Sequence, residues 1–108
     1  MLVRFLESIG FSRPEAIGMI LRCPALFTFS IENNFKPKLD YFMSEIKGKL
    51  ENLKEFPQYF AFSLEKRIKP RHLESMERGL ELPLSLMLKS TDEEFEQLLT
   101  NPSSVANV

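Results

Sequence analysis

The sequence repeats itself with a period of 33 residues. The stretch FPQYFAFSLEKRIKPR, residues 56–71, aligns without a gap with the stretch RCPALFTFSIENNFKPK, which begins at residue 22. A fixed period of this length is typical of stacked repeats, because one small helical unit cannot bury its apolar face alone. The identical pairs are Pro24/Pro57, Phe27/Phe60, Phe29/Phe62, Ser30/Ser63, Glu32/Glu65, Lys36/Lys69, Pro37/Pro70 and Met43/Met76.

Each copy of the repeat has local signals for a short helix followed by a tight turn. Ser12-Arg13-Pro14-Glu15 is a capping box with proline just inside the helix, and Pro24 stops the helix, which predicts a helix over 13–22. The runs PALF and PQYF place a proline before three residues that are too few for a full helix. They predict one 3₁₀ turn in each copy.

A long helix is expected after each turn, capped by Ser30 or by Ser63. Apolar residues follow each serine at intervals of three to four, and we expect a kink at Pro37 and at Pro70. A shorter helix over about 46–55 is expected between the copies. Near the end, LPLSLML predicts one or two helical turns, and the capping box Thr91-Asp92-Glu93-Glu94 predicts a closing helix.

These elements predict an all-α superhelical α-solenoid with about 33 residues per repeat: short helix, 3₁₀ turn, long helix. Residues 1–101 would form a single domain of about two and a half repeats and a C-terminal cap, with 102–108 as a flexible tail. The chain begins with apolar residues and no cap, as a cut edge of a longer array would, so we expect exposed apolar surface there. These residues are Leu2, Val3, Phe5 and Leu6.

Composition excludes several classes of protein. A hydrophobic content of 44% and a charged content of 27% indicate a globular chain, and no apolar run reaches the roughly 20 residues that cross a bilayer. No transit peptide or secretory signal is recognisable in this chain. One Cys (Cys23) and one His (His72) match no metal site, and no nucleophile–base pair is visible, so we expect neither an enzyme nor a cofactor nor a small-molecule substrate. His72 lies on the apolar stripe and reads as structural.

The phrase P-x-x-F-x-F-S-[IL]-E-x-x-x-K-P-[KR], the 33-residue period and the closing LPLSLMLKSTDEEFEQLL resemble the mitochondrial transcription termination factor (mTERF) family, especially its plant members. The resemblance implies an α-solenoid of chloroplasts or mitochondria that binds organellar double-stranded DNA or RNA. It also implies a role in transcription termination or regulation, or in RNA processing and splicing. A net charge of −1 means that any phosphate-binding surface must come from locally gathered cations.

Five cations of the long helices are the candidates for phosphate contacts. Lys36 and Lys69 each follow a glutamate by four residues, which predicts the surface pairs Glu32–Lys36 and Glu65–Lys69. The other three cations lack such an acid, and a phosphate would relieve the repulsion between Arg67 and Arg71. Stacking of the repeats would align Lys38 with Arg71 in a short basic ridge off the buried stripe, which either contacts nucleic acid or is an idle solvated face. The candidate set is Lys36, Lys38, Arg67, Lys69 and Arg71.

Two alternatives stay open at the level of sequence. The phenylalanines at repeat positions (Phe27, Phe29, Phe60 and Phe62) have core spacing, which we favour over stacking on bases. The rival to nucleic-acid binding is a protein-interaction solenoid, in which the apolar N-terminal edge and the acidic C-terminal cap dock on an organellar polymerase, ribosome or splicing factor.

Overall fold

The computed structural model describes residues 1–101, which contain helices and no strand, so the predicted all-α class is confirmed. The chain divides into two compact units, Met1–Ala61 and the part that starts at Phe62. The predicted single domain over 1–101 stays a prediction. The predicted tail over 102–108 lies outside the described residues.

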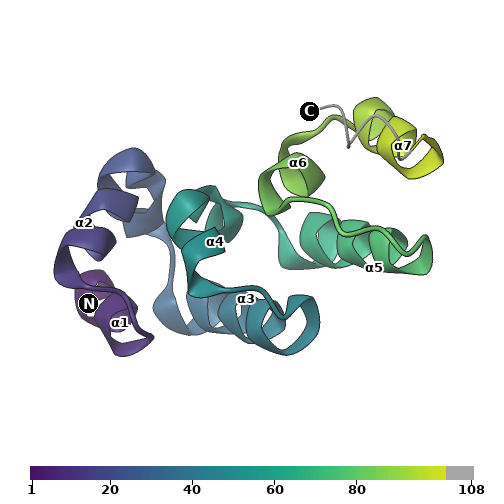
Figure 1. Ribbon diagram of the computed structural model, residues 1–108. Coiled ribbons are helices and arrows are strands. Elements are labelled where there is room, and N and C mark those ends of the chain that lie inside the picture. The colour runs from purple at the N-terminus through teal and green to yellow at the C-terminus, as the bar shows by residue number, and fades with distance from the viewer. Residues whose placement is uncertain (102–108) are drawn as a thin grey trace. The chain divides into compact units, whose positions relative to one another are not determined.

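Unit 1 contains one and a half copies of the repeat. Its elements are α1 (Leu2–Ser8), α2 (Arg13–Arg22), the 3₁₀ turn η1 (Pro24–Thr28), the π-helical turn η2 (Ile31–Phe35), α3 (Lys36–Tyr41), the π-helical turn η3 (Phe42–Ile46), α4 (Leu50–Glu55) and the 3₁₀ turn η4 (Pro57–Ala61). The short helix α2 packs on the short helix α4, and η1 packs on η4. Figure 1 shows α1 beside α2 and α3 below α4. Like elements therefore stack on like elements in unit 1, as in a helical repeat protein.

Unit 2 contains the long helix of the second copy and the two closing helices. Its elements are the π-helical turn η5 (Leu64–Ile68), α5 (Lys69–Glu77), α6 (Leu84–Lys89) and α7 (Asp92–Thr100). The buried side of this unit includes Ile68, Leu88, Phe95 and Leu99, and α5 packs on α6. No helix within residues 1–101 is both long and apolar enough to span a lipid bilayer.

The element boundaries repeat with the period of the sequence. The predicted helix over 13–22 is α2, and its capping box is present, with the Glu15 amide donating to Ser12 Oγ. The predicted 3₁₀ turns start at Pro24 and Pro57, and each of η1, η2 and α3 begins 33 residues before η4, η5 and α5. Ser30 and Ser63 both cap the following turn at 3.1 Å. The predicted unit of turn plus long helix is therefore confirmed.

A π-helical turn precedes each proline where we predicted a kink. The Lys36 amide donates to the Ile31 carbonyl, one residue further back than in an α-helix, and the Lys69 amide donates to the Leu64 carbonyl in the same way. A proline ring clashes with the carbonyl four residues before it and has no N–H to offer that carbonyl. Widening the turn in front of Pro37 is one way to place the proline inside a helix.

The short helix between the copies starts later than predicted, at Leu50 instead of about 46. The long helix instead runs on to Ile46, and Lys47 ends it in the left-handed conformation with φ 57°. Gly48 follows because a Cβ there would lie 2.3 Å from Cζ of the buried Phe42 ring. A left-handed lysine is uncommon, which is why the sequence pattern missed this end.

The aromatic core of unit 1 is built on Phe35, Phe42, Tyr59 and Phe60, each at most 1% exposed. The ring centroids of Phe35 and Phe60 are 4.9 Å apart. Phe60 thus has the predicted core position, and Phe29 and Phe62 are half-buried in their own units. The same prediction is wrong for Phe27, whose side chain is 67% exposed.

The first helix folds back onto unit 1. Leu2 and Leu6 are buried in α1, and Val3 and Phe5 are half-buried, with the Phe5 ring 6.0 Å from the Phe35 ring. The expected exposed apolar edge at residues 2–6 is therefore wrong, because α1 turns these side chains toward α2 and the core. Apart from Met1 at the N-terminus, the exposed large apolar side chains of unit 1 lie elsewhere, at Ile17, Leu21, Phe27 and Met43.

Candidate nucleic-acid interface

Lys36 is the exposed member of the predicted cation set, and its repeat counterpart Lys69 is half-buried. The Nζ atom of Lys36 lies 2.6 Å from Glu32 Oε1, and the Nζ atom of Lys69 lies 2.7 Å from Glu65 Oε2. The two predicted ion pairs are present, one helical turn apart in each case. Exposed pairs of this kind contribute about 0.3–0.5 kcal/mol, so an incoming phosphate can replace the glutamate at little cost.

Lys38 is buried, with 7% of its surface exposed. Its Nζ donates to Asn34 Oδ1 at 2.6 Å and to the Phe60 carbonyl at 2.9 Å, and it lies 5.9 Å from the centre of the Phe29 ring. Burial lowers the pKa of Lys38, since the ammonium is taken out of water. The expectation of a solvated Lys38 off the buried stripe is wrong, because the turn η4 brings a backbone carbonyl to this face of the helix.

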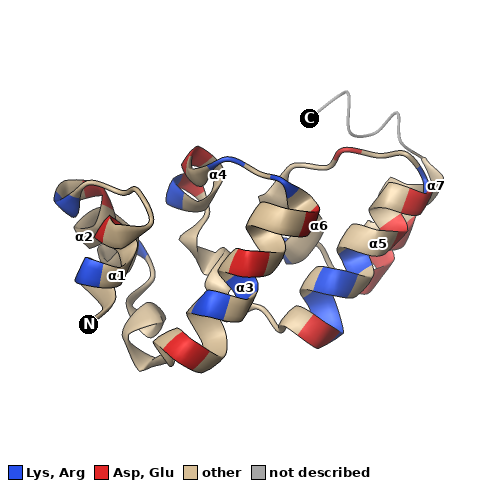
Figure 2. Cartoon of the chain, turned by 90° about the horizontal axis from the view of Figure 1, so that it is seen from below, with Lys and Arg blue, Asp and Glu red and all other residues tan. Residues whose placement is uncertain are grey.

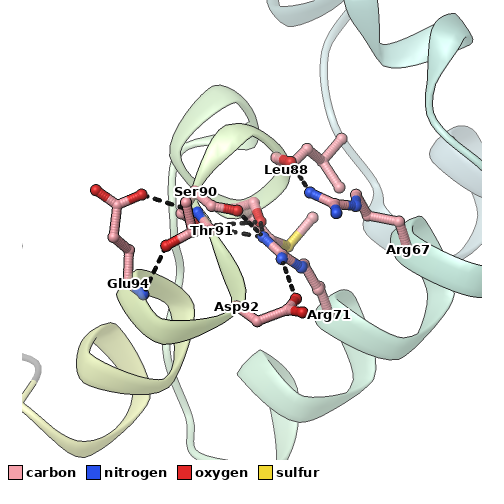
Figure 3. Close-up of polar contacts among 8 residues, drawn as sticks. Arg67, Arg71, Leu88, Ser90, Thr91, Asp92 and Glu94 are labelled. Carbon is pink, nitrogen blue, oxygen red and sulfur yellow. Dashed lines mark hydrogen bonds and ion pairs between the residues drawn. The ribbon is translucent and has the colours of Figure 1, made fainter.

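Arg71 is also buried, at 6% exposed, and it holds the end of α6 (Figure 3). Its Nη1 donates to the Met87 carbonyl at 2.9 Å, to the Ser90 carbonyl at 2.7 Å and to Ser90 Oγ at 3.0 Å. Its Nη2 lies 2.9 Å from Asp92 Oδ1. The predicted solvated position is therefore wrong for Arg71 as well. Cations at the C-terminus of a helix are favoured by the partial negative charge of its last carbonyls.

Arg67 is half-buried, one turn before Arg71 on the same helical run. Its Nη1 donates to the Leu88 carbonyl at 3.0 Å, and its guanidinium lies 5.6 Å from the centre of the Phe62 ring. In unit 1 the equivalent residue Asn34 donates from Nδ2 to the Phe60 carbonyl at 3.0 Å. Residues 34 and 38 in the first copy and their equivalents 67 and 71 in the second copy thus all donate to backbone carbonyls of a later element.

The predicted alignment of Lys38 with Arg71 stays a prediction, because the two residues lie in different units. Within each unit the buried cation donates hydrogen bonds to a carbonyl of a later element. Lys38 has no acid four residues before it, and a carbonyl 22 residues downstream accepts its hydrogen bond instead. A sequence pattern within one helix could not find that acceptor.

Lys66 is a candidate that the sequence analysis missed. It is exposed on η5, and residues 64–71 hold four cations (Lys66, Arg67, Lys69 and Arg71) against the single carboxylate of Glu65. Figure 2 shows this basic start of the long helix, followed by acidic residues along α5. The signal was present in the sequence, since the residues four before and four after Lys66 are Phe62 and Pro70, neither of which can pair with it.

His72 is buried at 9% exposed, in keeping with a structural role. Among residues 1–101 no three His, Cys, Asp or Glu side chains converge as metal ligands would. The exposed and half-buried cations of the long helices can bind anions through charge and N–H donation.

Comparison with known proteins identifies the family. The mTERF family profile matches residues 1–96. The chain is 34% identical over 98 residues to "Transcription termination factor MTERF4, chloroplastic" of Arabidopsis thaliana, covering 91% of this chain and 18% of that protein. It is 43% identical over 90 residues to "Transcription termination factor MTERF5, chloroplastic" of the same plant, covering 83% of this chain and 18% of that protein.

A third relative is "Transcription termination factor MTERF2, chloroplastic" of Arabidopsis thaliana, which is 37% identical over 95 residues, or 88% of this chain and 15% of that protein. The chain thus spans less than a fifth of the length of these relatives. No solved structure matches the chain. The family match over nearly the whole chain, together with a repeat of turn and long helix that the structure reproduces, places this chain in the mTERF family.

Proposed function

We propose that this chain is a nucleic-acid-binding helical-repeat segment of a chloroplast regulator of gene expression. The observation that carries the proposal is the mTERF match over residues 1–96. The relatives are named transcription termination factors, and each name includes the word chloroplastic. The proposed activity is regulation or termination of transcription if the target is organellar double-stranded DNA. If the target is RNA, the proposed activity is RNA processing or splicing. No catalytic step is part of the proposal.

The phosphate contacts are made by cations that are not buried, namely Lys36, Lys66, Arg67 and Lys69. Exposed Lys36 and half-buried Lys69 hold ion pairs with exposed glutamates, and Lys66 and half-buried Arg67 lie with Lys69 at the basic start of the long helix in unit 2. A phosphate that replaces a glutamate at Lys69 keeps a charged partner for the lysine and releases condensed counterions from the nucleic acid. Lys38 and Arg71 support this surface by fixing the elements behind it.

A salt titration of binding tests this assignment. The variant Lys66→Gln/Lys69→Gln removes two proposed contacts, and the control Lys47→Gln/Lys49→Gln removes two exposed lysines before α4. Both variants change the net charge equally, so only position differs. We expect the first variant to reduce the dependence of log affinity on log salt by about 0.7–0.9 per lost contact, and the control to leave it unchanged. Equal losses in the two variants would contradict the assignment.

The rival is a protein-interaction segment, and specific side chains favour it. In unit 1 Leu21 is 73% exposed and Phe27 is 67% exposed, and in unit 2 Leu73 and Met76 of α5 are both more than half exposed. An interface centred on apolar side chains depends weakly on salt. If the chain binds neither DNA nor RNA with a steep salt dependence, the interaction function replaces the proposed one.

A further inference from the structure

Arg71 uses the two ends of its guanidinium differently. The Nη1 atom is committed to the end of α6, through the carbonyls of Met87 and Ser90 and through Ser90 Oγ. The Nη2 atom contacts the carboxylate of Asp92 at 2.9 Å. Figure 3 shows the guanidinium between α5 and the start of α7, with the Asp92 carboxylate against it.

The burial of the two partners is very unequal. The Arg71 side chain is 7% exposed, whereas the Asp92 side chain is 96% exposed. The guanidinium is therefore fixed in place, and the carboxylate that it holds can leave into water without opening any packed surface. A fixed guanidinium whose Nη2 contacts an exposed carboxylate is preorganised for an oxyanion, because little side-chain entropy remains to be lost on binding.

We propose that Arg71 and the start of α7 form a latent phosphate site, which Asp92 occupies until a nucleic-acid phosphate displaces it. A carboxylate and a phosphate offer Nη2 the same kind of charged acceptor oxygen, and a charge-assisted hydrogen bond to either is short and strong. Asp92 thus competes with the phosphate for Arg71 and lowers the affinity of the chain for nucleic acid. This inference rests on the proposed nucleic-acid binding and adds a contact that Lys36, Lys66 and Lys69 do not supply.

Unit 1 lacks such a site at the equivalent position. The ammonium of Lys38 is enclosed by Asn34 Oδ1, the Phe60 carbonyl and the Phe29 ring, and its partners in the described residues include no exposed carboxylate. Displacing a backbone carbonyl would require η4 to move. The competition is therefore confined to unit 2.

The test compares two neighbouring neutralisations in the intact chain. Asp92→Asn removes the competitor's charge, and Glu93→Gln removes the same charge from the next residue, which is also exposed in the first turn of α7. Both substituted side chains are themselves exposed, so both variants are expected to fold. The probes are a short DNA duplex and a single-stranded RNA of matched length, each titrated over a range of salt.

We expect Asp92→Asn to bind more tightly than Glu93→Gln and to steepen the salt dependence of log affinity by about 0.7–0.9, as one added phosphate contact does. In the double variant Arg71→Lys/Asp92→Asn this gain should disappear, because the three N–H donors of lysine share one nitrogen, which cannot occupy the positions of both Nη1 and Nη2. A melting curve of the double variant establishes that it is folded. A gain that survives in a folded double variant would overturn the proposal.

The outcomes separate the inference from the function on which it rests. If the wild-type chain binds with a salt dependence that requires Lys66 and Lys69, and Asp92→Asn equals Glu93→Gln, the latent site is wrong and the proposed function stands. If neither the wild-type chain nor Asp92→Asn binds either probe, both fail together.

Discussion

At the scale of single residues, the cations divide by where their acceptors lie in the sequence. The partners of Lys36 and Lys69 are glutamates four residues away, and these pairs could be predicted from helix geometry alone. The acceptors of Lys38 and Arg71 include backbone carbonyls 16 to 22 residues downstream. Backbone carbonyls carry no side-chain signal, so the sequence made these two residues look free. The candidate surface was thus predicted in part, and its buried half was not.

Arg71 should contribute to the free energy of unfolding. Its replacement in Arg71→Met leaves the carbonyls of Met87 and Ser90 without their buried donor, and an unsatisfied buried acceptor costs about 1–3 kcal/mol in the free energy of unfolding. The matched control is Arg78→Met on the same run, since Arg78 is exposed and only reaches the Leu99 carbonyl at 3.5 Å. We expect the control to change stability by less than about 0.5 kcal/mol. Urea unfolding followed by circular dichroism measures both, and equal stabilities would show that Arg71 has no structural role.

Tyr59 should control the alkaline stability of unit 1. Its hydroxyl is buried and donates to the Lys38 carbonyl at 2.7 Å, and burial, with a smaller contribution from Tyr41, raises the pKa of Tyr59 well above 10.0. The unfolded chain therefore loses the phenol proton before the folded chain does. Stability from this group is full below the unfolded pKa of 10.0 and is lost as pH rises above it.

The variant Tyr59→Phe removes both the hydrogen bond and this titration. We expect it to cost about 0.5–1.5 kcal/mol at neutral pH and to flatten the loss of stability above the phenol's ordinary pKa. Unfolding by urea at neutral and alkaline pH measures the change. An alkaline slope that is the same with and without the hydroxyl would assign the effect to other groups.

At the scale of elements, prediction succeeded where both ends of a helix carry side-chain signals. The helix α2 begins at the Ser12 capping box and ends before Pro24, and its bounds match the predicted 13–22. The start of α4 was misplaced because the preceding helix ends at Lys47, a left-handed residue without a glycine's signature. The π-helical turns before Pro37 and Pro70 were read as kinks, since a π turn has no residue signature of its own.

The caps of the two long helices should contribute equally. Ser30 accepts from the Asn33 amide and Ser63 from the Lys66 amide, both at 3.1 Å, ahead of the same π-helical turn. Ser30→Ala and Ser63→Ala should therefore each cost about 1 kcal/mol in unfolding free energy. Ser44→Ala is the control, because Ser44 lies inside η3 and only bonds the Asp40 carbonyl of its own helix. Urea unfolding measures all three variants, and costs that differ between Ser30 and Ser63 by more than about 1 kcal/mol would contradict the equivalence of the copies.

At the scale of the whole molecule, the repeat in the sequence and the compact units do not share a boundary. The second copy runs from the turn η4 through the long helix, and the division at Ala61 falls between them. The family match is continuous over 1–96. In repeat proteins a copy gains most of its stability from its neighbour, so a few copies usually unfold together. We therefore expect the described residues to behave as one cooperative domain.

The two tyrosines make this expectation testable without a mutation. Tyr41 and Tyr59 are the only tyrosines, the chain has no tryptophan, and both tyrosines lie in unit 1. Tyrosine fluorescence during urea unfolding thus follows unit 1 alone, while far-ultraviolet circular dichroism follows the helices of both units. For one cooperative domain the two signals share a midpoint and a slope, because a two-state transition looks the same to every probe.

Separate unfolding would give a different pattern. If unit 2 unfolds first, circular dichroism should lose part of its signal before the tyrosines respond, and Arg71→Met should shift only that early phase. If the chain is one domain, the same variant should move both signals to lower urea together, although residue 71 lies in unit 2 and both tyrosines lie in unit 1. Two midpoints in the wild-type chain, with only one of them sensitive to Arg71→Met, would replace the single domain by two independent ones.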